Sequence, residues 1–347
     1  MLFHGVWRSR RESIAASAAP TEGGGGARDP TCNPRASRLP CLHRRAVAVR
    51  RARALPELPD ITVYVERVRD VLQGEVLRSV RMLNAFVLRT AVPPVTALEG
   101  RTVVDARNLG KRVVLEFDGG LFLVIHLMIA GRLRWLVAQA KTPGRIALAA
   151  FVFDHGQLVL TEAGTKRRAS IHVVEGAAAL AALDPGGIDV FVADLAAFRE
   201  RLVRENHTLK RALTDPRAFS GIGNAYSDEI LHRAQLSPFA LTQSLDDATI
   251  ERLHLATRTV LDEWTTRLRA EAGAWPEKVT AFHPEMAVHG RYGQPCPTCG
   301  SPVQRIVYAD NEANYCARCQ TGGRLLADRA FSRLLKDSWP KHIDDLA

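Results

Sequence analysis

Long apolar runs are missing from this 347-residue chain. The longest, residues 121–130, is interrupted by His126, whereas a membrane-spanning helix needs about 20 apolar residues. The sequence therefore predicts no membrane span. Internal repeats are also missing, and 46% of the residues are hydrophobic, which is enough to bury a core. Fibrous and wholly disordered chains are excluded, and we expect two or three domains.

Acidic residues are scarce at the N-terminus. Residues 1–55 contain eleven arginines, no lysine and three acidic residues, whereas residues 56–347 contain 36 basic and 34 acidic residues. Most of the net charge of +10 therefore belongs to the first segment. This segment also holds four consecutive glycines, residues 23–26, and no sustained helical or strand period, so we expect it to be a disordered basic extension. It could be a cleaved transit peptide, a basic arm, or upstream DNA translated from a start codon placed too early.

Regular patterns begin at Pro56. Apolar residues at helical spacing follow Pro59, and Gly74 ends them, which predicts one helix. Short β-type runs follow at residues 76–82, 101–106, 112–117, 121–127, 132–137, 148–153, 157–161 and 170–174. Their spacing predicts an antiparallel β-sandwich.

The second half of the chain has a different composition and periodicity. Residues 176–187 are rich in alanine, glycine and proline, and residues 195–270 have a helical pattern. We predict an α+β fold: a helix with an antiparallel β-sandwich over 56–175, a linker at 176–187, a helical domain over 188–287, a cysteine-built finger over 288–320 and a tail over 321–347.

Cysteine is also rare, and four of the six cysteines are clustered as two pairs, Cys296 with Cys299 and Cys316 with Cys319. Two such pairs separated by a hairpin's length are typical of a structural zinc site, because Zn²⁺ takes four thiolates in a tetrahedron. Two disulfides are the alternative. We predict one structural zinc, which has no open position for catalysis.

A glycine-asparagine turn at 220–224 lies between two helical segments, 208–213 and 225–234. Its glycines allow close approach, and the following helix would direct free N–H groups at an anion such as a DNA phosphate. By itself this pattern also fits a simple connection between two helices.

Four motifs, in this order, resemble those of the formamidopyrimidine-DNA glycosylase / endonuclease VIII family of base-excision repair enzymes. They are Pro56–Asp60 before a helix, Asn108–Arg112, the stretch from Leu209 to Glu229, and the cysteine pairs up to Gln320. The likeness covers residues 56–320. It implies a helix–two-turn–helix motif in the 188–287 domain and a zinc finger at 288–320.

The resemblance implies a catalytic group of Pro56, Glu57 and Lys111. Pro56 would attack the sugar C1′ and form a Schiff base, Glu57 would transfer protons, and Lys111 would hold a phosphate beside the lesion. Only a free α-amine can be the nucleophile, so Pro56 must become the N-terminus. We therefore expect residues 1–55, which end in Leu55, to be absent from the working enzyme, as a misplaced start or a cleaved segment.

The resemblance also implies that Asn224, Gly223, Arg167, Arg168 and Asn311 contact DNA. Residues 101–175 contain eleven basic and six acidic residues, which would suit a DNA backbone.

The chain departs from the family's motifs at several positions. Arg168 is followed by Ala169 where the family often has phenylalanine, and Ile129 stands at the methionine that fills the gap left by the flipped base. Asn311 replaces a finger arginine. The family pattern does not extend to residues 324–347.

We predict a DNA glycosylase with AP-lyase activity, acting as a monomer on damaged double-stranded DNA without any membrane partner. Its location would be the bacterial cytoplasm and nucleoid, or an organelle if residues 1–55 are a transit peptide. A catalytically silent DNA-binding relative is the alternative, and a general zinc-ribbon protein would explain only the finger. The sequence does not distinguish oxidised purines from pyrimidines as the preferred lesion.

Overall fold

The computed structural model of the chain describes residues 55–164, 166–277, 279, 283–308, 311–326 and 340–346, with the backbone alone for Tyr308 and Asn311. The expectations for residues 1–54 and for residues 327–339 of the tail lie outside these ranges. In the described parts, no helix is both long and apolar enough to cross a membrane.

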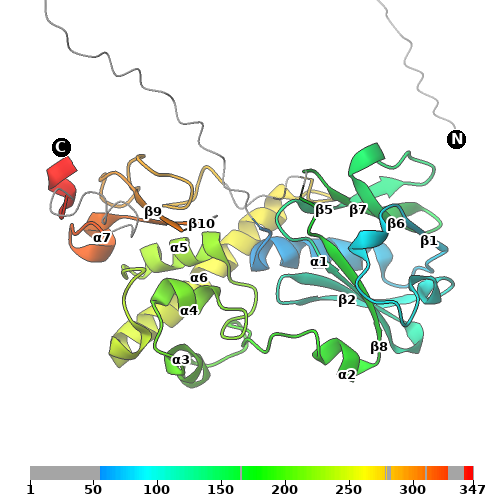
Figure 1. The fold of residues 1–347 in the computed structure, drawn as a ribbon, viewed down its shortest axis with the longest axis horizontal. Helices are drawn as coiled ribbons and strands as arrows, with labels where there is room; N and C mark the ends of the chain where they lie inside the picture. Colours follow the sequence, from blue (N-terminus) through cyan, green and yellow to red (C-terminus); the bar gives the residue numbers. More distant parts are fainter. Residues whose placement is uncertain are drawn as a thin grey trace, which may run out of the picture. The chain divides into compact units, whose positions relative to one another are not determined.

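The predicted strands form two four-stranded antiparallel sheets in the described part of the chain (Figure 1). One sheet has the order β1-β6-β7-β5 and the other β2-β3-β4-β8. The strands are β1 (Ser79–Met82), β2 (Val103–Leu109), β3 (Arg112–Phe117), β4 (Leu121–His126), β5 (Gly131–Val137), β6 (Ala147–Val152), β7 (Gly156–Glu162) and β8 (Ser170–Glu175). The predicted sandwich is confirmed, with strand ends displaced by up to three residues.

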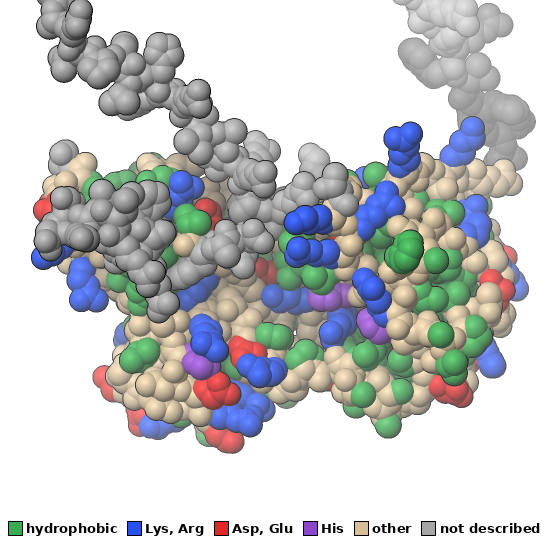
Figure 2. Space-filling model, in the orientation of Figure 1, with side chains coloured by type: hydrophobic (Ala, Val, Ile, Leu, Met, Phe, Trp, Pro, Cys, Tyr) green, Lys and Arg blue, Asp and Glu red, His purple; other side chains and the backbone are tan. Residues whose placement is uncertain are grey.

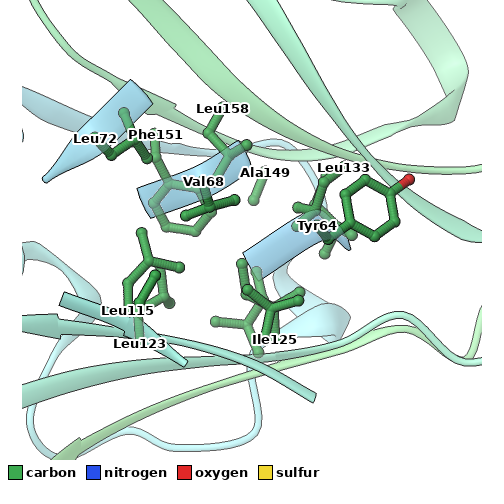
Figure 3. Close-up of a cluster of buried hydrophobic side chains, with 14 of the residues drawn as sticks. Tyr64, Val68, Leu72, Leu115, Leu123, Ile125, Leu133, Ala149, Phe151 and Leu158 are labelled. Atoms are coloured by element: carbon green, nitrogen blue, oxygen red, sulfur yellow. The ribbon is translucent and has the colours of Figure 1, made fainter. Parts of the chain in front are cut away.

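Helix α1 (Leu58–Leu72) supplies much of the sandwich core. The residues that it contributes to this core lie three or four positions apart, so they form one apolar face: Ile61, Tyr64, Val65, Val68 and Leu72. Figure 3 shows Tyr64, Val68 and Leu72 of this face beside side chains from both sheets, such as Leu115 and Phe151. Burying this face fixes where the helix begins, and with it the position of residues 56 and 57.

The helical region contains α3 (Leu195–Val203), α4 (Leu209–Thr214), α5 (Asn224–Arg233) and the long α6 (Asp247–Glu271). Asp194 and Asp246 cap the first and the last of these by accepting backbone N–H groups with their side chains. A second core, centred on Phe198, Phe219 and Tyr226, fills the space between these helices.

Two details differ from the predicted domain limits. The segment 176–187 includes a short helix, α2 (Ala177–Ala181), whose Leu180 is buried against the outer face of the β3–β4–β8 sheet. Trp275 and Val279, which we assigned to the helical domain, belong to the sandwich core, and the Trp275 indole donates to the carbonyl of Leu133 at 3.0 Å. Conversely, Leu58 of α1 packs in the helical core.

The finger is a hairpin of β9 (Gln304–Tyr308) and β10 (Asn311–Tyr315), followed by the short helix α7 (Ala317–Thr321). Strand β10 lies against α5 (Figure 1). The described part of the tail packs on this finger: Leu325, Leu326 and Ile343 are buried with Ile306 and Tyr315. The tail therefore extends the core of the finger.

Candidate active site

The Glu57 carboxylate is the centre of the site, and it is 2% exposed. It accepts three backbone N–H groups from the start of α5: Gly223 at 2.7 Å, Ala225 at 2.9 Å and Tyr226 at 3.2 Å. The first turn of a helix has unpaired N–H groups and the positive end of the helix dipole. Glu57 therefore joins the sandwich to the helical region through an anion site made of backbone.

This contact corrects the interpretation of the glycine-asparagine turn. We predicted that the N–H groups at the start of this helix would face an anion such as a DNA phosphate, but the Glu57 carboxylate accepts three of them. The turn itself has the expected shape, since Gly221 has a φ of +78° and its carbonyl accepts the N–H of Leu58 at 3.0 Å. The sequence pattern correctly predicted an anion at this helix start but not which one.

Lys111 lies at the turn between β2 and β3, next to Gly110, which has a φ of +59°. A Cβ atom placed on Gly223 would lie 2.4 Å from Glu57 Cδ and 2.5 Å from Lys111 Nζ. Glu57 and Lys111 thus meet over the bare backbone of Gly223, and any side chain there would displace them. Burial lowers the pKa of Lys111, an effect that the negative charge of Glu57 partly offsets.

Pro56 is buried directly before Glu57. In the described chain Leu55 precedes it, so its nitrogen is an amide. Asp60, which we did not predict, accepts the N–H of Glu57 at 2.9 Å, and burial raises the pKa of Asp60 to about 7. The signal was present in the sequence, because an acidic residue three positions after a helix N-cap is a capping-box pattern.

A second group that we did not predict, centred on Lys210, holds the first turn of α5 in place. The Lys210 ammonium donates to the Asn224 carbonyl at 2.6 Å, to Ser227 Oγ at 2.8 Å and to Asp228 Oδ1 at 2.6 Å. The other oxygen of Asp228 lies 2.8 Å from His289 Nδ1. These buried contacts fix α4, α5 and the entrance to the finger as one unit.

The finger reaches the same place through Asn224, whose side-chain amide donates to the Glu312 carbonyl at 2.8 Å. Asn311 precedes Glu312 in β10, so its backbone is close to the site. Two arginines of the finger that could substitute for the missing one already have partners. Arg305 stacks on Tyr292 and lies 3.8 Å from Glu312, the residue after Asn311, and Arg318 pairs with Asp344 at 2.5 Å.

The four finger cysteines form one cluster, and all four carry free thiols. Their Sγ atoms lie within 4.8 Å of one another, with Cys299 and Cys316 3.4 Å apart and Cys296 and Cys319 3.9 Å apart. Thiolates around zinc, with Zn–S bonds of about 2.3 Å, lie about 3.8 Å apart. The donor set and its size therefore fit a structural zinc, and the disulfide alternative is wrong.

A row of basic side chains crosses one end of the β2-β3-β4-β8 sheet. In register, Arg112 pairs with His126, and His126 with Ser170, which lies two residues after Arg168. Lys111 at the β2–β3 turn begins this cationic row. Figure 2 shows Lys, Arg and His side chains gathered on the sandwich part of the face in view.

Two features of the cationic row show how it is built. Burial and the neighbouring cations Arg112 and Lys111 lower the pKa of His126 to about 4, so its ring is neutral at pH 7. Arg167 and Arg168 are exposed, and the buried Glu162 carboxylate holds their loop by accepting the N–H of Arg168 at 2.9 Å.

Family models match three parts of the chain. The formamidopyrimidine-DNA glycosylase N-terminal domain matches residues 55–170, the H2TH domain of the same enzyme matches residues 187–269, and a zinc finger found in FPG and IleRS matches residues 293–322. The finger model and the thiol cluster together identify one structural zinc site.

Similar proteins agree with these matches. The formamidopyrimidine-DNA glycosylase of Thermus thermophilus is 31% identical over 280 residues, which cover 78% of this chain and 100% of that protein. A Mycobacterium tuberculosis protein described as an uncharacterized formamidopyrimidine-DNA glycosylase-like protein is 43% identical over 157 residues, 45% of this chain and 95% of that protein.

Solved structures share the fold. The Thermus thermophilus MutM (Fpg) crystal structure has a TM-score of 0.64 and 30% identity, covering 76% of this chain and 98% of that one. Lactococcus lactis Fpg, bound non-covalently to DNA containing an AP site, has a TM-score of 0.68 at 22% identity, covering 76% of this chain and 99% of that one. By sequence, fold and finger, the chain belongs to the formamidopyrimidine-DNA glycosylase family.

Proposed function

We propose that this protein excises oxidised bases from double-stranded DNA and then cleaves the strand at the abasic site, with Pro56 as the nucleophile. One observation carries the proposal: Glu57, next to Pro56, is held by three N–H groups of α5 and meets Lys111 over Gly223. A nucleophile and a proton-transfer group, adjacent at 56 and 57, are thus brought to a phosphate-binding cation at Lys111 by the backbone at the start of α5.

The chemistry starts from the free secondary amine that Pro56 has when it is the N-terminus. Its lone pair attacks the sugar C1′, the bond from C1′ to the base breaks, and the base leaves with the electron pair and a proton. Opening of the sugar ring gives an iminium ion at C1′. Loss of a proton from C2′ then expels the 3′ phosphate, and water hydrolyses the iminium to release Pro56.

Glu57 and Lys111 have separate roles in this scheme. Glu57 lies beside the amine and transfers the proton when the sugar ring opens. Its three backbone donors hold the carboxylate in one orientation. A carboxylate on a mobile loop would not be held in this way. Lys111 binds the phosphate next to the lesion as a compact positive charge. The damaged nucleotide must leave the stack to reach these groups.

DNA contacts would continue from Lys111 along the cationic row, with Arg167 and Arg168 at its far side. Because Asn224 donates to the finger backbone, we assign it a second role in this scheme: it links the start of α5 to the hairpin that carries Asn311. The hairpin would then lie beside the same DNA segment as the catalytic group.

The test compares two chains on a duplex with an abasic site in the presence of borohydride, which reduces an iminium to a stable bond. The first chain begins at Pro56, and the second has one additional alanine before Pro56, which turns the proline nitrogen into an amide. We expect covalent protein–DNA complex with the first chain only. If neither chain is trapped although both bind the duplex, the protein is a silent DNA-binding relative.

A further inference from the structure

Phe86 is the most exposed large hydrophobic side chain in the described part of the protein, at 87%. It lies in the 3-10 turn η1 (Ala85–Val87), where its N–H donates to the Asn84 side chain at 3.0 Å. Val87, the next residue, is buried in the sandwich core. The turn is thus anchored on both sides of Phe86, and the ring is held in solvent by structure around it.

The position of this turn follows from its β-partners. Leu88 forms a parallel bridge with Ile171 of β8, and the Arg89 N–H donates to the Ile171 carbonyl at 2.8 Å. Because the bridge is parallel, the residues before Leu88 lie beside the residues before Ile171. Phe86 is therefore next to the loop that carries Arg168, at the end of the sheet where the cationic row runs.

The distance from Phe86 to the catalytic group suits one DNA duplex. From β3, which follows Lys111, to the 88–90 segment there are three strand spacings of about 4.8 Å each. That is about 14 Å, close to the width of about 12 Å across the major groove of a duplex, so a side chain at this distance can reach the strand opposite the one held at Lys111. Phe86 would thus meet the same stretch of duplex as Lys111.

The surroundings of Phe86 are basic. Arg89, Arg145 and Arg168 are exposed, and no carboxylate pairs with them among the described residues. Asn84 connects the turn to the other sheet, because its N–H donates to the Leu148 carbonyl at 3.0 Å. An exposed aromatic ring among unpaired arginines is the arrangement that binds unstacked nucleobases, since the ring stacks on the base while the cations bind phosphates.

We propose that Phe86 stacks on the nucleobase left unpaired in the opposite strand when the damaged nucleotide leaves the duplex. The inference rests on the proposed function, because it takes the same DNA as ligand. It assigns a DNA contact to the η1 turn, which lies outside all four motifs that identified the family. Stacking uses the π face of the base and therefore adds recognition of a disrupted pair without reading its identity.

The experiment measures Kd of the full chain for two duplexes, one with a tetrahydrofuran abasic analogue and one undamaged, over a series of salt concentrations. We expect Phe86→Ala to weaken binding of the abasic duplex about five- to tenfold, and binding of the undamaged duplex less than twofold. The slope of log Kd against log salt should stay unchanged, because no phosphate contact is lost. The thermal midpoint should also stay unchanged, since the ring is exposed.

Two control variants separate stacking from charge and from surface hydrophobicity. Arg89→Ala should weaken binding of both duplexes and reduce the slope of log Kd against log salt by about one. Val192→Ala removes an exposed apolar side chain of the helical region (83% exposed) and should change nothing. Phe86→Trp should keep wild-type affinity, and its added fluorescence should be quenched more by the abasic duplex than by the undamaged one.

The inference is wrong if Phe86→Ala binds the abasic duplex as tightly as wild type does, if it weakens binding of both duplexes equally, or if it changes the salt slope. Absence of quenching in Phe86→Trp would also overturn it. Failure of the proposed function is a different result, since it appears as an absence of borohydride trapping by the chain that begins at Pro56, whatever the binding data show.

Discussion

Gly223→Ala tests the catalytic geometry without removing any functional side chain. The new methyl would lie 2.4 Å from Glu57 Cδ and 2.5 Å from Lys111 Nζ, whereas ordinary contacts begin at 3.4 Å. One or both side chains must therefore move by about 1 Å. The backbone can stay, because Gly223 has a φ of −134°, which alanine adopts without strain.

The fold should survive this change while the chemistry does not. Alanine at a helix N-cap is less favourable than glycine by about 1 kcal/mol or less, which lowers the thermal midpoint by only a few degrees. A displacement of about 1 Å in a catalytic group can cost about 10²-fold in rate. We therefore expect borohydride trapping by a Pro56-initiated Gly223→Ala chain to slow about 100-fold.

The matched control is Gly144→Ala, an exposed glycine in the turn before β6 with nothing within 4 Å of its would-be Cβ. It should trap at the wild-type rate. A Gly223→Ala chain that is folded and equally fast would show that the position of Glu57 over Gly223 is not needed. An unfolded chain would refute the argument that only side-chain ends must give way.

Three further predictions concern the metal, the pH dependence and the finger. Cys316→Ser should lose the single zinc and DNA binding while the sandwich stays folded, as metal analysis, a binding assay and circular dichroism would show, because metal binding supplies the folding energy of the finger. Because the pKa of Asp60 is about 7 instead of 3.8, the folded state keeps a proton that the unfolded chain loses, and this residue makes the free energy of unfolding fall as the pH rises from about 4 to 7. Asp60→Asn keeps an acceptor for the Glu57 N–H and should remove that fall, measured by urea unfolding across this range. Asn311→Arg should shift the product at an abasic site from the 3′ unsaturated aldehyde toward the 3′ phosphate on a sequencing gel, because asparagine has no ionisable proton or charge to assist the second elimination; a wild-type product that is nearly all phosphate at early times would contradict this.

Local patterns determined most of what could be predicted. The short β-type runs around Phe151 and Leu158, separated by a turn-like break at 154–156, placed β6 and β7 within one residue at each end, because a buried strand reads as a short apolar run bounded by turn residues. The helix after Pro59 was equally clear. The cysteine spacing predicted the zinc cluster, since two hairpin-separated pairs have few other uses.

Long-range packing was not predictable in the same way. Trp275 lies far from the sandwich in sequence and just after a helical segment, yet it belongs to the sandwich core. Leu58 is part of α1, whose other core residues pack in the sandwich, yet it packs in the core of the helical region. An apolar period shows that a side chain is buried, but it does not show against which partner. That depends on how α1 and α6 pack, which no single segment encodes.

The same limit explains the correction at the start of α5. Free N–H groups at a helix start attract whichever anion the fold brings to them, and the sequence pattern indicated an anion there without identifying a carboxylate of the chain itself. Glu57 reaches them because α1, buried between the sheets, begins where Leu58 donates to the Gly221 carbonyl. With a resident carboxylate on these donors, a phosphate at the same place would meet a negative charge. In the proposed scheme we therefore assign phosphate binding to Lys111 and the cationic row, whose positive charges lie on the sandwich.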